Sequence, residues 1–333
     1  MLLRNLARSW RRSPARPSFS GPRKDETGRV FGENPVSGII LVGINDTAPS
    51  IAAANWALER ARSTLDRIVI VHVLNDVDAA NSVARDHALA FLAKQAISLR
   101  ISAPETQVTT ELLIGNPLEE LTTAASAATL LVIGTHKTGF VQGRVFGSKY
   151  IQLAATTPIP LAVIPMPANR GGRAGVVVGL SDSRSTAVTL DFAIKEARRT
   201  LSSITLVHSW TLPNMPGEVF RDGGRREFEY SLIAEKLLDH AKTHIHTVAP
   251  DVPVRTRSLR RPPAEGLLDA AGTALLLVLG RTAPGPAGGG VLGATVHDVL
   301  VNLTTATMIV PPENDRPGTP EFQLADTEHV AIA

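Results

Sequence analysis

The stretch that decides the fold runs from Leu130 to Ser148 and reads Leu-Leu-Val-Ile-Gly-Thr-His-Lys-Thr-Gly-Phe-Val-Gln-Gly-Arg-Val-Phe-Gly-Ser. Its first four residues are apolar and stop at Gly134, which is typical of a strand buried on both faces of a parallel sheet. A glycine-rich loop then leads to Ser148, a residue type that suits the start of a helix. Glycines let a backbone approach a ligand closely, and a helix start offers free N–H groups. The stretch therefore predicts an α/β domain with a phosphate cradle after this strand.

The spacing within this stretch is specific. Two residues separate Gly134 from Lys137, and nine separate Lys137 from the Gly147-Ser148 pair. This is neither the Gly-x-Gly-x-x-Gly fingerprint nor a P-loop. It resembles the signature of the universal stress protein family, Gly-x2-Gly-x9-Gly-Ser/Thr, with Lys137 at the position of the second glycine.

Composition limits the class of protein. The 333 residues are enough for about two domains. The absence of cysteine excludes disulfides, zinc–thiolate sites and cysteine nucleophiles. Apart from a basic N-terminal tail and an acidic C-terminal tail the chain is nearly neutral, which argues against a nucleic-acid partner. No apolar run is long enough to cross a bilayer, so we expect no membrane partner.

Apolar segments alternate with helical patterns along the first half of the chain. The apolar segments are 38–44, 68–74, 108–114, 130–133 and 159–164. The helical patterns between them begin at Ser50, predicted as an N-cap, and near Leu89, Leu118 and Ser148. Such alternation predicts a parallel, doubly wound α/β sheet.

The pattern then repeats. Val176–Asp182 restates Ile40–Asp46, and Leu276–Gly280 restates Leu130–Gly134. The offset is 136 positions at the first match and 146 at the second, so the second copy has about ten extra residues between its second and fourth strands. Two copies at this spacing indicate a domain duplication. The predicted organisation is a disordered basic tail (1–37), domain 1 (38–166), a linker (167–173), domain 2 (174–311) and a disordered acidic tail (312–333).

The resemblance covers both domains and implies their fold. Members of this family have flavodoxin-like domains, similar to adenine nucleotide alpha hydrolases, with five parallel strands in the order 3-2-1-4-5. They pair through the fifth strand. We therefore expect an intramolecular pseudo-dimer of the two domains, and a homodimer of chains stays open. The resemblance also implies a cytoplasmic regulatory module of the stress response that binds an adenine nucleotide, namely ATP with or without Mg²⁺.

The resemblance further implies where ATP would bind. ATP-binding relatives end the first strand with an Asp that contacts adenosine; here Asn45 stands there, and its amide offers both an acceptor and a donor. Lys137 would place an ammonium beside the phosphates, stay exposed, or crowd a loop that normally needs glycine. The expected ATP-binding residues are Ile44, Asn45, Asp46, Val73, Ile133, Gly134, His136, Lys137, Gly147, Ser148, Lys149 and Tyr150.

Domain 2 departs further from the signature. Ala283 and Ala294 replace the second glycine and the hydroxyl residue, and Ser181 stands where the Asp would be. We therefore expect nucleotide to be held mainly by domain 1.

Enzymatic function has little support in the sequence. His72 and His208 lie inside apolar segments and are interpreted as structural. No arrangement of acid, base and metal-binding carboxylates is apparent, so we expect at most slow ATP hydrolysis. The alternative to a nucleotide-binding module is a scaffold that acts through protein contacts alone.

Overall fold

The computed structural model describes residues 38–136, 148–166, 171–183, 185–212, 223–281 and 292–312. The predictions for the N-terminal tail, for Lys137 and Gly147, for most of the linker and for residues 313–333 lie outside the described residues. Among the described residues, no helix is long and apolar enough to cross a membrane.

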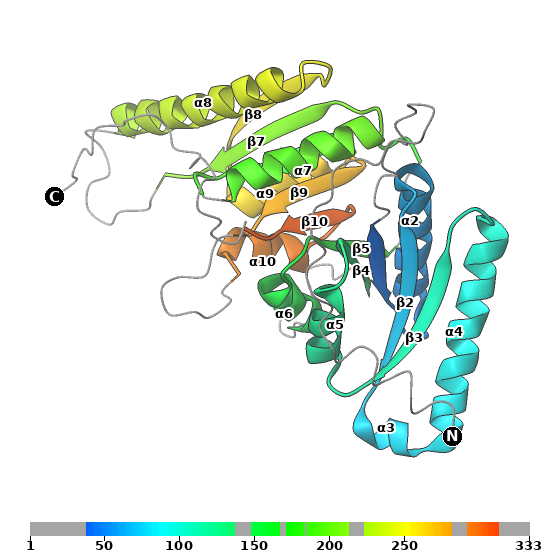
Figure 1. The fold of residues 1–333 in the computed structure, drawn as a ribbon. Coiled ribbons are helices and arrows are strands. Elements are labelled where there is room, and N and C mark those ends of the chain that lie inside the picture. The colour runs from blue at the N-terminus through cyan, green and yellow to red at the C-terminus, as the bar shows by residue number, and fades with distance from the viewer. Residues whose placement is uncertain are drawn as a thin grey trace, which may run out of the picture. The chain divides into compact units, whose positions relative to one another are not determined.

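Domain 1 alternates strands and helices, as the hydrophobic pattern predicts (Figure 1). Its elements are β1 (Ile39–Gly43), α2 (Ala48–Thr64), β2 (Arg67–Leu74), α3 (Asp76–Ala80), α4 (Ser82–Ser102), β3 (Val108–Ile114), α5 (Pro117–Ala125), β4 (Leu130–His136), α6 (Ser148–Thr156) and β5 (Leu161–Met166).

Domain 2 repeats this order without a counterpart of α3 among the described residues. Its elements are β6 (Val176–Gly179), α7 (Thr186–Arg199), β7 (Ile204–Trp210), α8 (Gly223–Val248), β8 (Val254–Arg260), α9 (Pro263–Ala271), β9 (Leu276–Gly280), α10 (Ala294–Val301) and β10 (Thr307–Val310).

The strands form one ten-stranded sheet in the order β3-β2-β1-β4-β5-β10-β9-β6-β7-β8. Each domain thus has the predicted order 3-2-1-4-5, with parallel neighbours throughout. The domains join where β5 pairs antiparallel with β10, with Ala162 opposite Met308. The fifth strands therefore connect the two halves, as expected.

Two hydrophobic cores cover the two faces of the sheet, and each runs through both domains. One core packs α2, α4, α7 and α8 against the sheet, and the other packs α5, α6, α9 and α10. Along β1, Ile40 and Val42 enter the first core while Leu41 enters the second, because successive strand side chains point to opposite faces. This explains why inner strands such as β1, β6 and β9 are apolar, whereas the edge strands β3 and β8 carry polar and charged residues.

The start of α2 differs from the prediction. The helix begins at Ala48 with Thr47 as its N-cap residue, three positions before the predicted N-cap Ser50. The fixed backbone angle of Pro49 suits a first helical turn. The Ser50 hydroxyl instead donates to the Thr47 carbonyl oxygen at 2.9 Å and accepts from the Asn45 amide at 3.2 Å. Ser50 thus stabilises the turn that links β1 to α2.

Polar contacts join the domains on the α6 side of the sheet. Arg281, at the end of β9, donates from Nη1 to the carbonyl oxygens of Ala154 (3.1 Å) and Thr157 (2.9 Å). These carbonyls end α6, where a cation is favourable. Burial lowers the pKa of the Arg281 guanidinium from its ordinary value. The Tyr150 hydroxyl donates across the same interface to the Leu300 carbonyl oxygen at 3.4 Å.

Candidate functional site

The carboxyl ends of β1, β2 and β4 meet at one edge of domain 1. β1 lies between β2 and β4, and Gly43 at its end is in register with Val71 and Ile133. The chain leaves β1 toward one neighbour and returns later to the other, so the strand order reverses here. Ligands of open α/β sheets bind in the crevice at such a point.

The segment after β1 is held by its own hydrogen bonds. The Ile44 amide donates to the Val71 carbonyl oxygen at 2.8 Å, and the side chain of Ile44 is buried. The next two residues, Asn45 and Asp46, are exposed. The Asn45 side-chain oxygen accepts from the Thr47 hydroxyl at 2.6 Å. The turn therefore holds Asn45 at the strand end, the position for which the family resemblance implies a nucleoside contact.

Gly134 in β4 is required by the packing of the protein itself. A Cβ atom at this position would lie 2.0 Å from the Pro49 carbonyl oxygen and 2.7 Å from the Ser50 nitrogen. The first turn of α2 thus occupies the space of a side chain. Sequence reasoning assigned this glycine to ligand approach alone, because a contact between segments so far apart in the chain is invisible in the spacing.

Gly280 has the corresponding role in domain 2. A Cβ atom there would lie 2.5 Å from Ser185 Oγ and 2.6 Å from Thr189 Oγ1, and both residues belong to the start of α7. The first glycine of the signature therefore lets a helix start pack on the fourth strand in both domains.

The remaining predicted residues fall into three groups. At the edge of the crevice, the end of β2 contains Val73, and the second half of β4 contains Ile133 and His136. His136 is exposed. Ser148 and Lys149 open α6, as predicted for a helix start. Tyr150 is buried at 7% exposure, and its hydroxyl contacts domain 2. The Tyr150 hydroxyl therefore takes part in the contact between the domains.

Domain 2 contains a pocket of about 280 Å³ at the equivalent edge. It is lined by the ends of β6, β7 and β9 and by the start of α10, including Ser181, His208, Gly293 and Thr295. The described residues that line it include no Asp, Glu, Lys or Arg. Domain 2 therefore has a hollow at the carboxyl ends of its strands, although its signature residues have changed. The retained spacing of Gly280 and Gly293 was the available signal.

The two strand histidines are structural, as predicted. His72 Nδ1 lies 2.8 Å from the Ile44 carbonyl oxygen, and His208 Nδ1 lies 3.0 Å from the Leu180 carbonyl oxygen. Each ring therefore ties the second strand of its domain to the end of the first. Among the described residues, no group of three or more His, Asp or Glu side chains is placed to hold a metal ion.

Comparisons with known proteins agree with this architecture. A universal stress protein of Mycolicibacterium smegmatis is 27% identical over 82% of this chain and 97% of its own length. Universal stress protein MT2052 of Mycobacterium tuberculosis is 28% identical over 78% of this chain and 81% of its own. The crystal structure of a universal stress protein from Archaeoglobus fulgidus superposes with a TM-score of 0.64, at 14% identity, over 83% of this chain and 99% of that one.

The match to the family itself falls on both halves of the chain. The profile of the universal stress protein family matches residues 37–165 and again residues 174–311. These two segments coincide with the two halves of the ten-stranded sheet. The chain therefore belongs to the universal stress protein family, of which it contains two domains in tandem.

Proposed function

We propose that this protein is a regulatory module of the stress response that binds ATP in the crevice of domain 1. The observation that carries the proposal is that Asn45 and the end of β4 lie where the strand order reverses. In the sequence, the glycine-rich segment then leads from β4 into α6. Asn45 and the apolar residues Ile44, Val73 and Ile133 would take the adenosine.

The phosphates would lie toward the start of α6. A helix start carries a partial positive charge and free N–H groups, which favour anions. Gly147, Ser148 and Lys149 stand at this start in the sequence, and Lys137 would add a second cation. Mg²⁺ would arrive with the phosphates, since magnesium sites often use few protein ligands and retain several waters. Asp46 directly follows Asn45 in the sequence and is exposed, so its carboxylate is a candidate ligand for such a magnesium ion.

The pocket in domain 2 supports the proposal by its shape. Its volume of about 280 Å³ is close to the lower end of ligand pockets in general, roughly 300–1,000 Å³. The same fold with the same strand order therefore leaves room for a nucleoside-sized group. The described residues that line the domain 2 pocket include no Lys or Arg, so we expect its affinity for a triphosphate to be lower than that of domain 1.

One observation about Gly134 bears on the scaffold alternative. Gly134 would be needed even without a ligand, because α2 packs on it. Its presence therefore does not distinguish a nucleotide-binding protein from a scaffold, and the discriminating residues are Gly147 and Ser148.

Calorimetric titration with ATP tests the proposal. In nucleotide-free protein, Gly147→Val should abolish binding, because a branched side chain would stand where backbone approaches phosphate. Ser148→Ala removes one hydrogen bond and should weaken binding about fivefold. The matched control is Gly293→Val in domain 2, which should leave the affinity of the tight site unchanged.

Three results would contradict the proposal in different ways. Two equivalent sites per chain would contradict the preference for domain 1. No binding to nucleotide-free, folded protein would leave the scaffold as the function. If the protein releases phosphate from ATP and Gly147→Val abolishes that release, the function is that of a slow ATPase.

A further inference from the structure

The two domains meet at equivalent positions of the repeat. On the face of the sheet covered by α2 and α7, Arg60 of α2 contacts Glu196 of α7, and Arg199 of α7 contacts Ser63 of α2. The two residues of each pair are 136 positions apart. This is the offset that relates β1 to β6 in the sequence. In the sheet, Ala162 faces Met308, which lies 146 positions further on, the offset that relates β4 to β9. A pseudo-two-fold axis therefore passes through both contacts.

At a true two-fold axis a residue meets its own copy, whereas here it meets a residue of opposite charge. Glu196 is buried, with 2% of its side chain exposed, and Arg60 is exposed by 12%. Arg60 Nη1 lies 2.6 and 2.5 Å from the two Glu196 carboxylate oxygens, and Arg199 Nε lies 3.0 Å from one of them. The Arg60 guanidinium carbon is also 6.0 Å from the ring centroids of Trp56 and Phe192.

Pairing of like domains would place like charges at this point. Two copies of domain 1 would bring Arg60 against Arg60, and two copies of domain 2 would bring Glu196 against Glu196. A buried charge without a counter-charge is strongly destabilising. In a domain 2 pair Glu196 would keep Arg199 of its own helix as a counter-charge, whereas in a domain 1 pair two Arg60 guanidiniums would face each other. The contact between α2 and α7 therefore discriminates most strongly against a pair of domain 1 copies.

The sheet contact discriminates in the same direction by size. Ala162 and Met308 are both fully buried, and Met carries three more side-chain heavy atoms than Ala. Two alanines facing each other would leave a void, and two methionines would overfill the space. Charge at the contact of α2 with α7 and volume in the sheet are independent properties, and both disfavour a second copy of domain 1 as the partner of domain 1.

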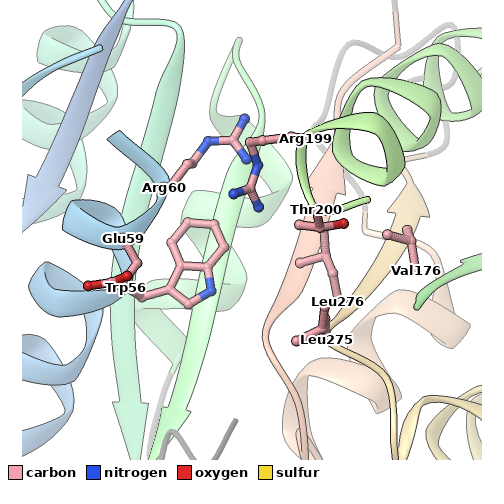
Figure 2. Close-up of a pocket in the computed structure, with 8 residues that line it drawn as sticks. All are labelled: Trp56, Glu59, Arg60, Val176, Arg199, Thr200, Leu275 and Leu276. Carbon is pink, nitrogen blue, oxygen red and sulfur yellow. The ribbon is translucent and has the colours of Figure 1, made fainter. Parts of the chain in front are cut away.

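We propose that Arg60–Glu196 and Ala162–Met308 are specificity determinants, through which domain 1 accepts domain 2 and rejects a second copy of itself. The fifth strand and α2 of domain 1 thus form a surface whose partner must carry a carboxylate and a large apolar side chain at the facing positions. A pocket of about 210 Å³ lies beside the charge pair (Figure 2). Trp56 and Arg60 of domain 1 line it on one side, and Arg199, Leu275 and Leu276 of domain 2 line it on the other. It gives exchanged side chains room to adjust.

The test uses the full chain with a protease site placed in residues 167–173 and cleaved after folding. Native mass spectrometry at micromolar concentration then distinguishes the three pairings of the two halves. We expect the unlike pair in excess over the statistical 1:2:1 mixture. Arg60→Glu or Glu196→Arg should each weaken the unlike pair by roughly a hundredfold or more. The double exchange Arg60→Glu with Glu196→Arg should restore it to within about tenfold, since the charges are again opposite.

The matched control is Arg198→Glu, a charge reversal on the same helix at an exposed residue that pairs with Asp251 inside domain 2. It should leave the pairing unchanged. The size determinant is tested in the same way, with Ala162→Met weakening the unlike pair and Ala162→Met with Met308→Ala restoring it. A statistical mixture of pairs, full separation of the halves, or an effect of Arg60→Glu no larger than that of the control would each overturn the proposal.

Discussion

Replacement of Gly134 by alanine should destabilise the fold itself, independently of any ligand. The added methyl carbon would lie 2.0 Å from the Pro49 carbonyl oxygen and 2.3 Å from the Pro49 carbonyl carbon. Both atoms are backbone, so the clash is relieved only by moving the start of α2. That helix buries Ala53, Ala54, Ala57 and Leu58 among others, and a shift of it disturbs the core on that face.

The magnitude follows from the distances. Overfilling a packed core costs about 1–3 kcal/mol and occasionally more, and a backbone clash this short belongs at the upper end, about 3 kcal/mol. For a domain pair of this size the melting temperature should fall by about 6 °C or more. Gly43→Ala is the matched control, because its new methyl group would meet Leu121 and Ile133 side chains at 3.4 Å, an ordinary contact. Gly280→Ala should be intermediate, since the clash there involves hydroxyl side chains.

Urea unfolding of nucleotide-free protein, followed by tryptophan fluorescence, measures these differences. The expected order of destabilisation is Gly134→Ala, then Gly280→Ala, then Gly43→Ala. A free energy of unfolding for Gly134→Ala within about 0.5 kcal/mol of the Gly43→Ala value would refute the packing argument. The glycine would then have to be explained by its ligand alone.

Three further predictions concern the contact between the domains, the N-terminal segment and an exposed ion pair inside domain 2. Tyr150→Phe removes the hydrogen bond to Leu300 and should lower the free energy of unfolding by about 1 kcal/mol, while calorimetry should find unchanged ATP affinity. Deletion of residues 1–37 should keep the melting temperature within a few degrees, since that segment has no periodic apolar face; a large drop would show that it packs on the domains. Hydrogen bonding from Arg198 lowers the pKa of Asp251. The pair therefore stabilises the fold above the unfolded-state pKa of Asp251, and this stabilisation is lost as the pH falls through the folded-state pKa. Arg198→Ala should raise the pKa of Asp251 in an NMR titration, and no rise would contradict the pairing.

Much of the fold was predictable from local pattern. The runs at Ile40, Leu131 and Val278 are apolar because both faces of each strand are covered, and that property is readable residue by residue. The duplication was equally visible, because the offset between matching segments stays constant over each part of the domain. The start of α2 was misplaced by three residues, since Ser50 has the chemistry of an N-cap but uses its hydroxyl in the preceding turn.

What could not be predicted depends on contacts between distant segments. Glu196 looks like an ordinary surface residue of an amphipathic helix, yet it is buried because a second domain covers it. Tyr150 follows the signature directly, and only the position of α10 shows that its hydroxyl reaches Leu300. The clash that requires Gly134 likewise depends on where α2 begins.

The joining of β5 to β10 has a consequence for self-assembly. Because the fifth strands pair with each other, β3 and β8 are the edge strands of the sheet that the described residues form. An unpaired strand invites addition of strands from other molecules, and charged side chains discourage it. β8 exposes Arg255, Arg257 and Arg260, and β3 exposes Glu111 between threonines and apolar residues. Pairing of a further strand from another molecule is therefore opposed most strongly at β8. An engineered fibril that extends the sheet should add its strands at β3.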